Sequence, residues 1–95
     1  MALNFKILLK QNSKSLYLKL IGDFDGSSAL ELINTLKEHG KKAEKIFINT
    51  RDIFSIHPFG QDVFRKNCTI LYKNSHKLIF TGEKSSKLSP EADIY

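Results

Sequence analysis

Apolar and polar residues alternate in two short runs near the N-terminus. The apolar positions of these runs are Phe5, Ile7 and Leu9, then Leu16, Leu18 and Leu20. Alternation with a period of two is typical of a β-strand that buries one face. The polar stretch 11–15 is short enough to join an antiparallel pair. We therefore predict a hairpin whose second strand turns its three leucines toward the core.

Beyond the hairpin, the apolar period changes to that of a helix. The residues at this spacing are Ala29, Leu32, Ile33 and Leu36, which form one apolar stripe. Ser28 and Glu31 have the spacing of a capping box at the start of a helix. Gly40 suits the left-handed residue that ends one. We expect an amphipathic helix between these signals.

In the second half of the chain, a strand-like apolar run is again followed by apolar residues at helical spacing. Residues 45–49 form a compact run that is apolar on both faces, as in a covered central strand. Pro58 suits the first turn of a second helix, whose core-facing residues are Gly60, Phe64, Cys68 and Leu71. Residues 78–80 predict a further buried strand. For residues 83–95 we expect at most a short helix and then an irregular end.

These elements predict one α/β domain spanning residues 1–95, in the order β-β-α-β-α-β-α. Helices between later strands imply parallel neighbours joined by right-handed crossovers, with the hairpin supplying an antiparallel edge. We expect a mixed sheet of about four strands with its helices mainly on one face. The turns at 22–28 and 54–60 then lie at the carboxyl ends of neighbouring strands and are close in space.

Composition narrows the function classes. The chain has 95 residues, of which 41% are hydrophobic and 26% charged, which is ordinary for a globular protein. No apolar stretch is long enough to cross a membrane, and the N-terminus does not have the pattern of a signal peptide, so we predict a cytoplasmic protein. The net charge of +5 is spread along the chain. Nucleic-acid binding is therefore an alternative function rather than the leading one.

The residues offer no pattern for catalysis, a metal or a cofactor. Cys68 is the only cysteine, and its helical position predicts a packed thiol rather than a nucleophile. His39, His57 and His76 are not linked to further ligands at metal-binding spacing. The phosphate-loop and dinucleotide-binding fingerprints are both missing. We expect neither an enzyme nor a bound cofactor, and small-ligand sensing is a further alternative.

Residues 18–29 resemble a turn of the STAS family (sulfate transporter and anti-sigma factor antagonist). They read Leu-Lys-Leu-Ile-Gly-Asp-Phe-Asp-Gly-Ser-Ser-Ala, similar to the family's strand, Gly-x-apolar-Asp turn and helix start near Ser/Thr-Ala. Residues 46–49 and 53–60 resemble its third strand and the loop that opens its second helix. The resemblance covers nearly the whole chain. It implies a non-catalytic regulator that binds an anti-sigma factor, a kinase-like protein or a larger signalling assembly.

The second loop departs from the family pattern. In phosphoswitching members it reads Asp-Ser-Ser/Thr-Gly, and a kinase modifies the first serine. Here His57 stands at the aspartate position, Pro58 at the phosphoacceptor position, and only Gly60 matches. Because proline has no hydroxyl, the resemblance implies that this chain is not switched by phosphorylation at that position. Ser55 is the nearest hydroxyl and is an alternative acceptor.

The two turns and the second helix together predict a partner-binding surface. Its residues are Asp23, Asp25, Ser27, Ser55, His57, Phe59, Asp62, Arg65 and Lys66. The two aspartates also suit a structural task, because acids in such turns accept N–H groups of the next helix. Phe59 is either a packed core residue, which is the commoner case, or an exposed anchor for a partner. A histidine in such a loop is either solvated or a proton-sensitive contact.

Overall fold

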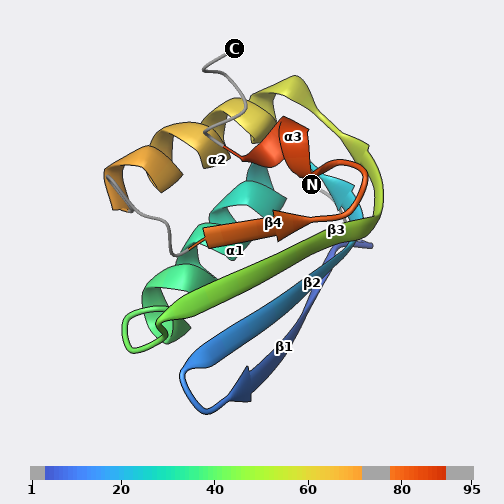
Figure 1. Ribbon diagram of the computed structural model, residues 1–95. Helices are drawn as coiled ribbons and strands as arrows, with labels where there is room; N and C mark the ends of the chain where they lie inside the picture. The colour runs from blue at the N-terminus through green and yellow to red at the C-terminus, as the bar shows by residue number, and fades with distance from the viewer. Residues whose placement is uncertain (1–3, 72–77, 90–95) are drawn as a thin grey trace.

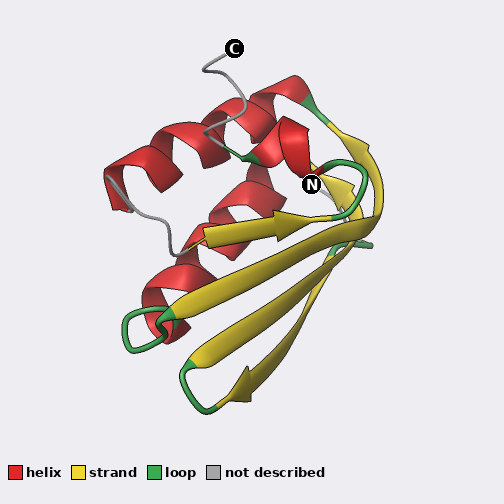
Figure 2. Cartoon of the chain, viewed as in Figure 1, coloured by secondary structure: helices red, strands yellow, loops and turns green. Residues whose placement is uncertain are grey.

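The computed structural model describes residues 4–71 and 78–89. Within them the elements follow the predicted α/β order (Figures 1 and 2). The elements are β1 (Lys6–Asn12), β2 (Ser15–Phe24), α1 (Gly26–His39), β3 (Lys45–Ile56), α2 (Pro58–Leu71), β4 (Leu78–Thr81) and α3 (Ser85–Leu88). The described residues therefore confirm the predicted fold class.

The strands form one mixed sheet in the order β1-β2-β3-β4. β1 pairs with β2 in the antiparallel sense, whereas β2–β3 and β3–β4 are parallel. A parallel pair needs a crossover connection, and α1 and α2 supply the two crossovers. Both helices lie on the same side of the sheet (Figure 1). As predicted, the carboxyl ends of β2 and β3 meet at one edge.

The core lies between the sheet and these two helices. It contains the three leucines of β2 and the apolar stripe of α1, all of them buried as predicted. Aromatic rings extend the core along the sheet: Phe24 meets Phe5 edge-to-face at 5.8 Å and Phe64 at 6.1 Å. Such aromatic pairs stabilise a core beyond their buried area. Cys68 is packed here too, and burial raises the pKa of its thiol to about 12.

β3 is longer than predicted. The apolar run suggested a strand of residues 45–49, but β3 continues to Ile56 and includes the first three residues of the turn expected at 54–60. Its pairing with β2 shifts register twice, once around Thr50 and once at Phe54. Each shift inserts one extra residue, which breaks the alternation that marks a strand in sequence. Thr50 is buried and donates from Oγ1 to the carbonyl of Thr81 at 2.7 Å.

The start of α1 differs from the prediction, and its end lies at Gly40 as predicted but in a different conformation. The helix starts at Gly26 and its N-cap is Asp25, because this carboxylate lies within 2.9 Å of the Ser28 amide. Ser28 therefore belongs to the first turn and does not cap it. Gly40 has a φ of −85° and is right-handed. Its amide still donates to the Leu36 carbonyl at 2.8 Å, so no left-handed residue is needed to end the helix.

The sheet has one open face. The run at 45–49 predicted a strand covered on both sides, but residues 4–71 and 78–89 place no helix on the face opposite α1 and α2 (Figure 1). Phe47 lies on this face and is only half-buried. Its ring stacks on Tyr17 of β2, with centroids 5.0 Å apart. The stacking shields part of each ring where no helix does.

Candidate interaction surface

The carboxyl ends of β2 and β3 lie side by side, as predicted. Asp23 and Ser55 are register partners, and the Ser55 hydroxyl donates to Asp23 Oδ1 at 2.7 Å. The His57 amide donates to the Phe24 carbonyl at 2.9 Å, which carries the pairing to the start of α2. We call the two corners together, residues 23–28 and 54–60, the rim. The rim joins two segments that are about thirty residues apart along the chain.

Asp23 connects three strands of the structure. One carboxylate oxygen accepts the Ser55 hydroxyl of β3, and the other accepts from the Asn4 side chain at 3.2 Å, just before β1. Its carbonyl accepts from the Ser28 hydroxyl at 2.9 Å, at the start of α1. Each carboxylate oxygen of Asp23 therefore already accepts one hydrogen bond that holds the rim together, which gives this side chain a structural role.

Asp25 has the structural task that the sequence suggested for it. Its Oδ1 accepts from the Ser28 amide at 2.9 Å and from the Ser27 hydroxyl at 2.8 Å. These hydrogen bonds, led by the amide, hold the pKa of the carboxyl well below its ordinary value. The negative charge also lies at the helix N-terminus, where the peptide dipoles favour it. Asp25 thus remains ionised at neutral pH and fixes the direction of α1.

Two glycines allow the helix starts to touch. A Cβ on Gly60 would lie 2.6 Å from the carbonyl carbon of Asp25, so α2 meets the α1 corner backbone to backbone. A Cβ on Gly26 would lie 2.9 Å from ring atoms of Phe59. The Phe59 ring therefore lies over Gly26, yet 71% of the residue is exposed. The expectation of a packed core residue is wrong, and the alternative of an exposed anchor fits.

Phe54 is a second exposed phenylalanine of the rim, and the sequence analysis missed it. It is the residue that the second bulge adds to β3, and 68% of it is exposed. Its neighbour Ile53 is buried. Because Phe54 is the surplus residue of a bulge, the alternation along the chain gave no signal of its exposure.

His57 and Pro58 form the entrance to α2. His57 is exposed, and its carbonyl accepts from the Gln61 amide at 3.0 Å, as expected of a residue just before a helix. Pro58 is the first helical residue, as predicted. Its ring places no hydroxyl at this entrance and removes one backbone donor. The nearest hydroxyl, on Ser55, is already hydrogen-bonded to Asp23.

The three predicted residues of α2 divide into two groups. Asp62 and Lys66 are exposed. Arg65 is half-buried, and its Nη2 donates to the carbonyl of Ser86 at 3.1 Å. Gln61 similarly donates to the carbonyl of Lys87 at 2.7 Å. Arg65 thus helps to hold α3 against α2, so its guanidinium is not part of a free helix surface.

The described residues give no sign of a metal centre. Across 4–71 and 78–89, no three His, Cys, Asp or Glu side chains come close enough together to hold an ion. Nor does any helix there have the length and apolar character that a membrane span requires. The functional groups of the rim are serine hydroxyls, two hydrogen-bonded carboxylates, one histidine and two exposed phenylalanine rings.

Comparisons with known proteins support the fold. No family model and no curated protein sequence matches the chain. Among solved structures, a crystal structure of Mglu superposes with a TM-score of 0.70 at 12% identity, covering 81% of this chain and 19% of that one. This chain thus spans about a fifth of the Mglu chain, so the likeness concerns one part of that protein.

Two smaller proteins are similar over most of their length. One is an uncharacterized protein of the DUF3478 family with a SpoIIAA-like fold from Shewanella loihica PV-4, with a TM-score of 0.63 and 10% identity over 87% of this chain and 69% of that one. The other is the anti-sigma factor antagonist SpoIIAA in its unphosphorylated form, with a TM-score of 0.55 and 15% identity over 79% and 71%. At these identities the likeness concerns the fold alone. The predicted STAS-like fold is confirmed.

Proposed function

We propose that this chain is a non-catalytic regulatory domain that binds a protein partner through the rim, in the manner of an anti-sigma factor antagonist. The observation that carries this proposal is the exposure of Phe54 and Phe59, which both lie on the corner at 54–60, next to the corner at 23–28. Large aromatic side chains are the commonest anchors of protein interfaces. The partner is an anti-sigma factor, a kinase-like protein or a larger signalling assembly.

The chemistry of the rim favours binding over catalysis. The two carboxylate oxygens of Asp23 each accept a hydrogen bond from a neighbouring segment, and Oδ1 of Asp25 accepts from the start of α1. The thiol of Cys68 is buried in the core with a raised pKa, so it supplies no nucleophile at the rim. What the rim presents is shape, two apolar rings and the imidazole of His57. Such a surface suits recognition by a complementary apolar pocket.

We further propose that binding is not controlled by phosphorylation at the α2 entrance. Pro58 occupies the first helical position, where switching relatives have their acceptor serine. A phosphate on a serine at this position would add negative charge to the corner that contacts Asp25. Proline has no hydroxyl, so Pro58 cannot be phosphorylated. Under this proposal the domain binds constitutively, and its control comes from the amount of protein or from the partner.

The test is capture of partners by the purified chain from extract of its own cells, followed by reconstitution with the purified partner. The double variant Phe54→Ser with Phe59→Ser should lose that partner, because both anchors are gone. The control is Leu9→Ser, which removes an exposed apolar residue of β1 away from the rim. Equal affinity of the partner for wild type and the double variant, measured by calorimetry, would reject the rim as the binding surface.

A further inference from the structure

The open face of the sheet contains a hollow of about 360 Å³ that none of the rim residues lines. Its apolar lining is supplied by Leu8, Leu9, Tyr17, Leu18 and Phe47, and its polar lining by Lys10, Lys19, Asn49 and Thr81. Most of these residues come from β1, β2 and β3, and Thr81 comes from the end of β4. The hollow therefore lies mainly across three neighbouring strands, on the side of the sheet away from α1 and α2.

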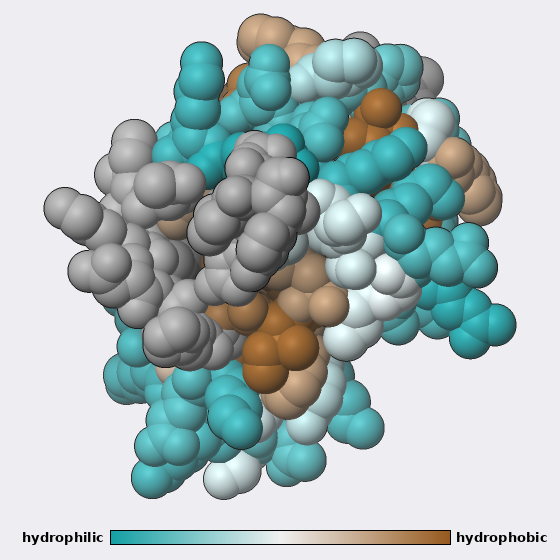
Figure 3. Space-filling view, turned by 45° about the horizontal axis from the view of Figure 1, so that its top comes forward, coloured by the Kyte–Doolittle hydropathy of each residue, from teal (hydrophilic) through white to brown (hydrophobic). Residues whose placement is uncertain are grey.

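The apolar part of this face is unusually open to solvent. Leu8 is 53% exposed and Tyr17 is 40% exposed. The rings of Tyr17 and Phe47 stand parallel, at an interplanar angle of 9°, and make a short wall. Figure 3, turned from the view of Figure 1, shows an apolar area with polar side chains beside it. A sheet face that meets only water normally carries polar residues, so this composition indicates an apolar occupant.

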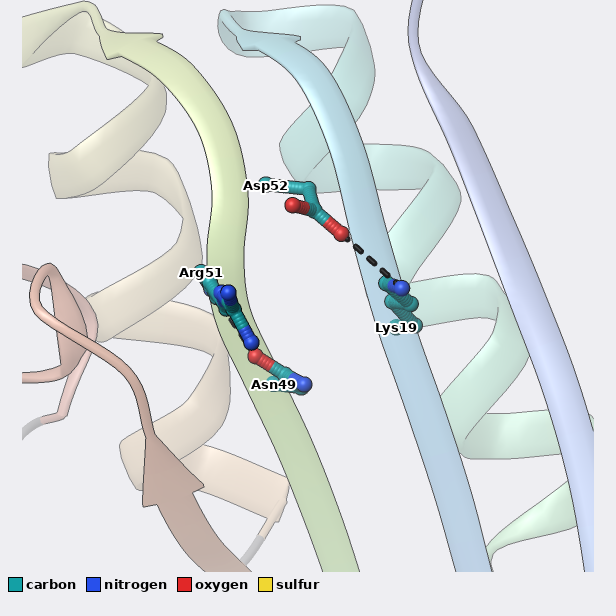
Figure 4. A network of polar contacts seen from close by, with 4 residues as sticks. All are labelled: Lys19, Asn49, Arg51 and Asp52. Atoms are coloured by element: carbon teal, nitrogen blue, oxygen red, sulfur yellow. Dashed lines mark hydrogen bonds and ion pairs between the residues drawn. The ribbon is translucent and has the colours of Figure 1, made fainter.

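The charged groups that line the hollow are all cations. Lys19 forms an ion pair with Asp52 at 3.0 Å (Figure 4), and Asp52 is not one of the residues that line the hollow. Lys10 stands opposite Tyr17 in the β1–β2 register, and no acid in the described parts of the chain pairs with it. Asn49 uses its Oδ1 to accept from the Arg51 amide at 2.9 Å, and its side-chain N–H groups remain as donors.

We propose that this hollow binds a single-chain anionic amphiphile, with the alkyl chain against Leu8, Tyr17 and Phe47 and the anionic head group at Lys10 and Lys19. The combination of an apolar lining with a few placed donors is typical of small-molecule sites, which range from about 300 to about 1,000 Å³. The present volume is near the lower end of that range and suits one alkyl chain. A second copy of this face would bring like charges together, which disfavours self-association there.

A titration with decanoate, kept below its micelle concentration, tests the proposal. Amide chemical shifts of the isotope-labelled chain should change in β1, β2 and β3 and stay constant at the rim. Replacing both lysines, as Lys10→Gln with Lys19→Gln, should weaken decanoate binding about tenfold, because two exposed charges each contribute a modest amount. The matched control is Lys37→Gln with Lys41→Gln, which removes equal charge at the end of α1.

A comparison ligand of opposite charge, together with a check that the variants fold, distinguishes the proposal from its alternatives. Decyltrimethylammonium, which has the same chain and a positive head group, should bind at least about tenfold more weakly than decanoate. Equal binding of the two, unchanged affinity of the double lysine variant, or binding only by an acidic amphipathic peptide would each overturn the proposal. Circular dichroism confirms that the variants fold. Phe59→Ser should leave decanoate binding unchanged, so this inference and the proposed function fail separately.

Discussion

The rim and the open sheet face use polar and apolar residues in opposite ways. At the rim, most polar side chains are engaged with one another, and two phenylalanines project into solvent. On the open face, the apolar residues line a hollow, and Lys10 and Lys19 stand beside it. The rim thus presents protruding apolar groups, whereas the open face presents a recess. We infer that the rim inserts into a partner, while the open face receives a ligand.

The comparison teaches that a residue type alone does not mark a site. Asp23, Asp25 and Ser27 are predicted contact residues, and their hydrogen bonds also build the corners. We therefore expect them to affect a partner at least through the placement of Phe59 and His57. Each of the following tests changes a residue of the rim or of the open face and measures stability or binding. They start with the largest expected effect.

Gly60→Ala should separate the two corners. The added Cβ would lie 2.6 Å from the Asp25 backbone, which cannot move without shifting α1. We expect the free energy of unfolding to fall by about 2 kcal/mol, the usual cost of overpacking. Urea unfolding measures the loss, and faster labelling of the buried Cys68 thiol should accompany it.

Gly26→Ala is the matched control for this change. Its Cβ would meet only the exposed ring of Phe59, which is able to swing aside. If Gly26→Ala were as destabilising as Gly60→Ala, the backbone contact between the corners would not be the reason for the loss.

Asp25→Asn should change the acid sensitivity of the fold. The pKa of Asp25 is lowered in the native state, so the native state binds fewer protons than the unfolded chain. The stability that this carboxylate contributes is present at neutral pH and is lost as the pH falls below the ordinary aspartate pKa of about 4. Wild type should therefore lose more thermal stability between about pH 5 and about pH 2 than Asp25→Asn does.

Melting curves across this pH range measure the difference. Asp62→Asn serves as the control, because Asp62 is an exposed acid of α2 outside the α1 cap. A slope for Asp25→Asn as steep as that of wild type would contradict the role assigned to the cap.

Tyr17→Thr should affect the open face and leave the rim intact. Threonine keeps a good strand former but loses the stacking on Phe47. We expect a decrease of about 0.5–1 kcal/mol in the free energy of unfolding, which is the usual worth of a cross-strand aromatic pair. Chemical denaturation measures this change. Tyr17→Phe retains the ring and should match wild type; an equal loss in both variants would assign the effect to the hydroxyl instead.

Phe59→Ser should have the smallest effect on stability. The residue is mostly exposed, so the free energy of unfolding should change by no more than about 0.5 kcal/mol. Affinity for the rim partner should nevertheless fall at least about tenfold, as for an interface anchor. Phe59→Tyr keeps the ring and should retain binding. A large loss of stability in the serine variant would mean that the ring serves the fold.

Regular periods allowed most of the fold to be predicted. The leucines of β2 and the stripe of α1 follow the strand and helix periods without a break, and both are buried as expected. The end of β3 was missed because its two bulges interrupt the alternation. The N-cap of α1 was misplaced because Asp25 and Ser28 are both good capping residues. Only the three-dimensional path of the backbone decides between them.

The sequence predicted where the candidate site lies, but it did not predict which of its side chains are exposed to solvent. The meeting of the two corners follows from parallel neighbouring strands, which the alternation of helices and strands indicates. Whether Phe59 is packed or exposed depends on the space left by Gly26 and on how closely α2 approaches α1. These are long-range properties of packing. The pattern along the chain does not contain them, so the sequence left both alternatives for Phe59 open.

The bulges of β3 also bear on which changes of chain length this strand tolerates. β3 has 12 residues where its partner β2 has 10, so two residues are surplus to the pairing. We expect that deleting Phe54 would shorten the strand while leaving Ile53 buried and Ser55 opposite Asp23. The side chain at this surplus position should then be exchangeable, or removable altogether, without rebuilding the domain around it.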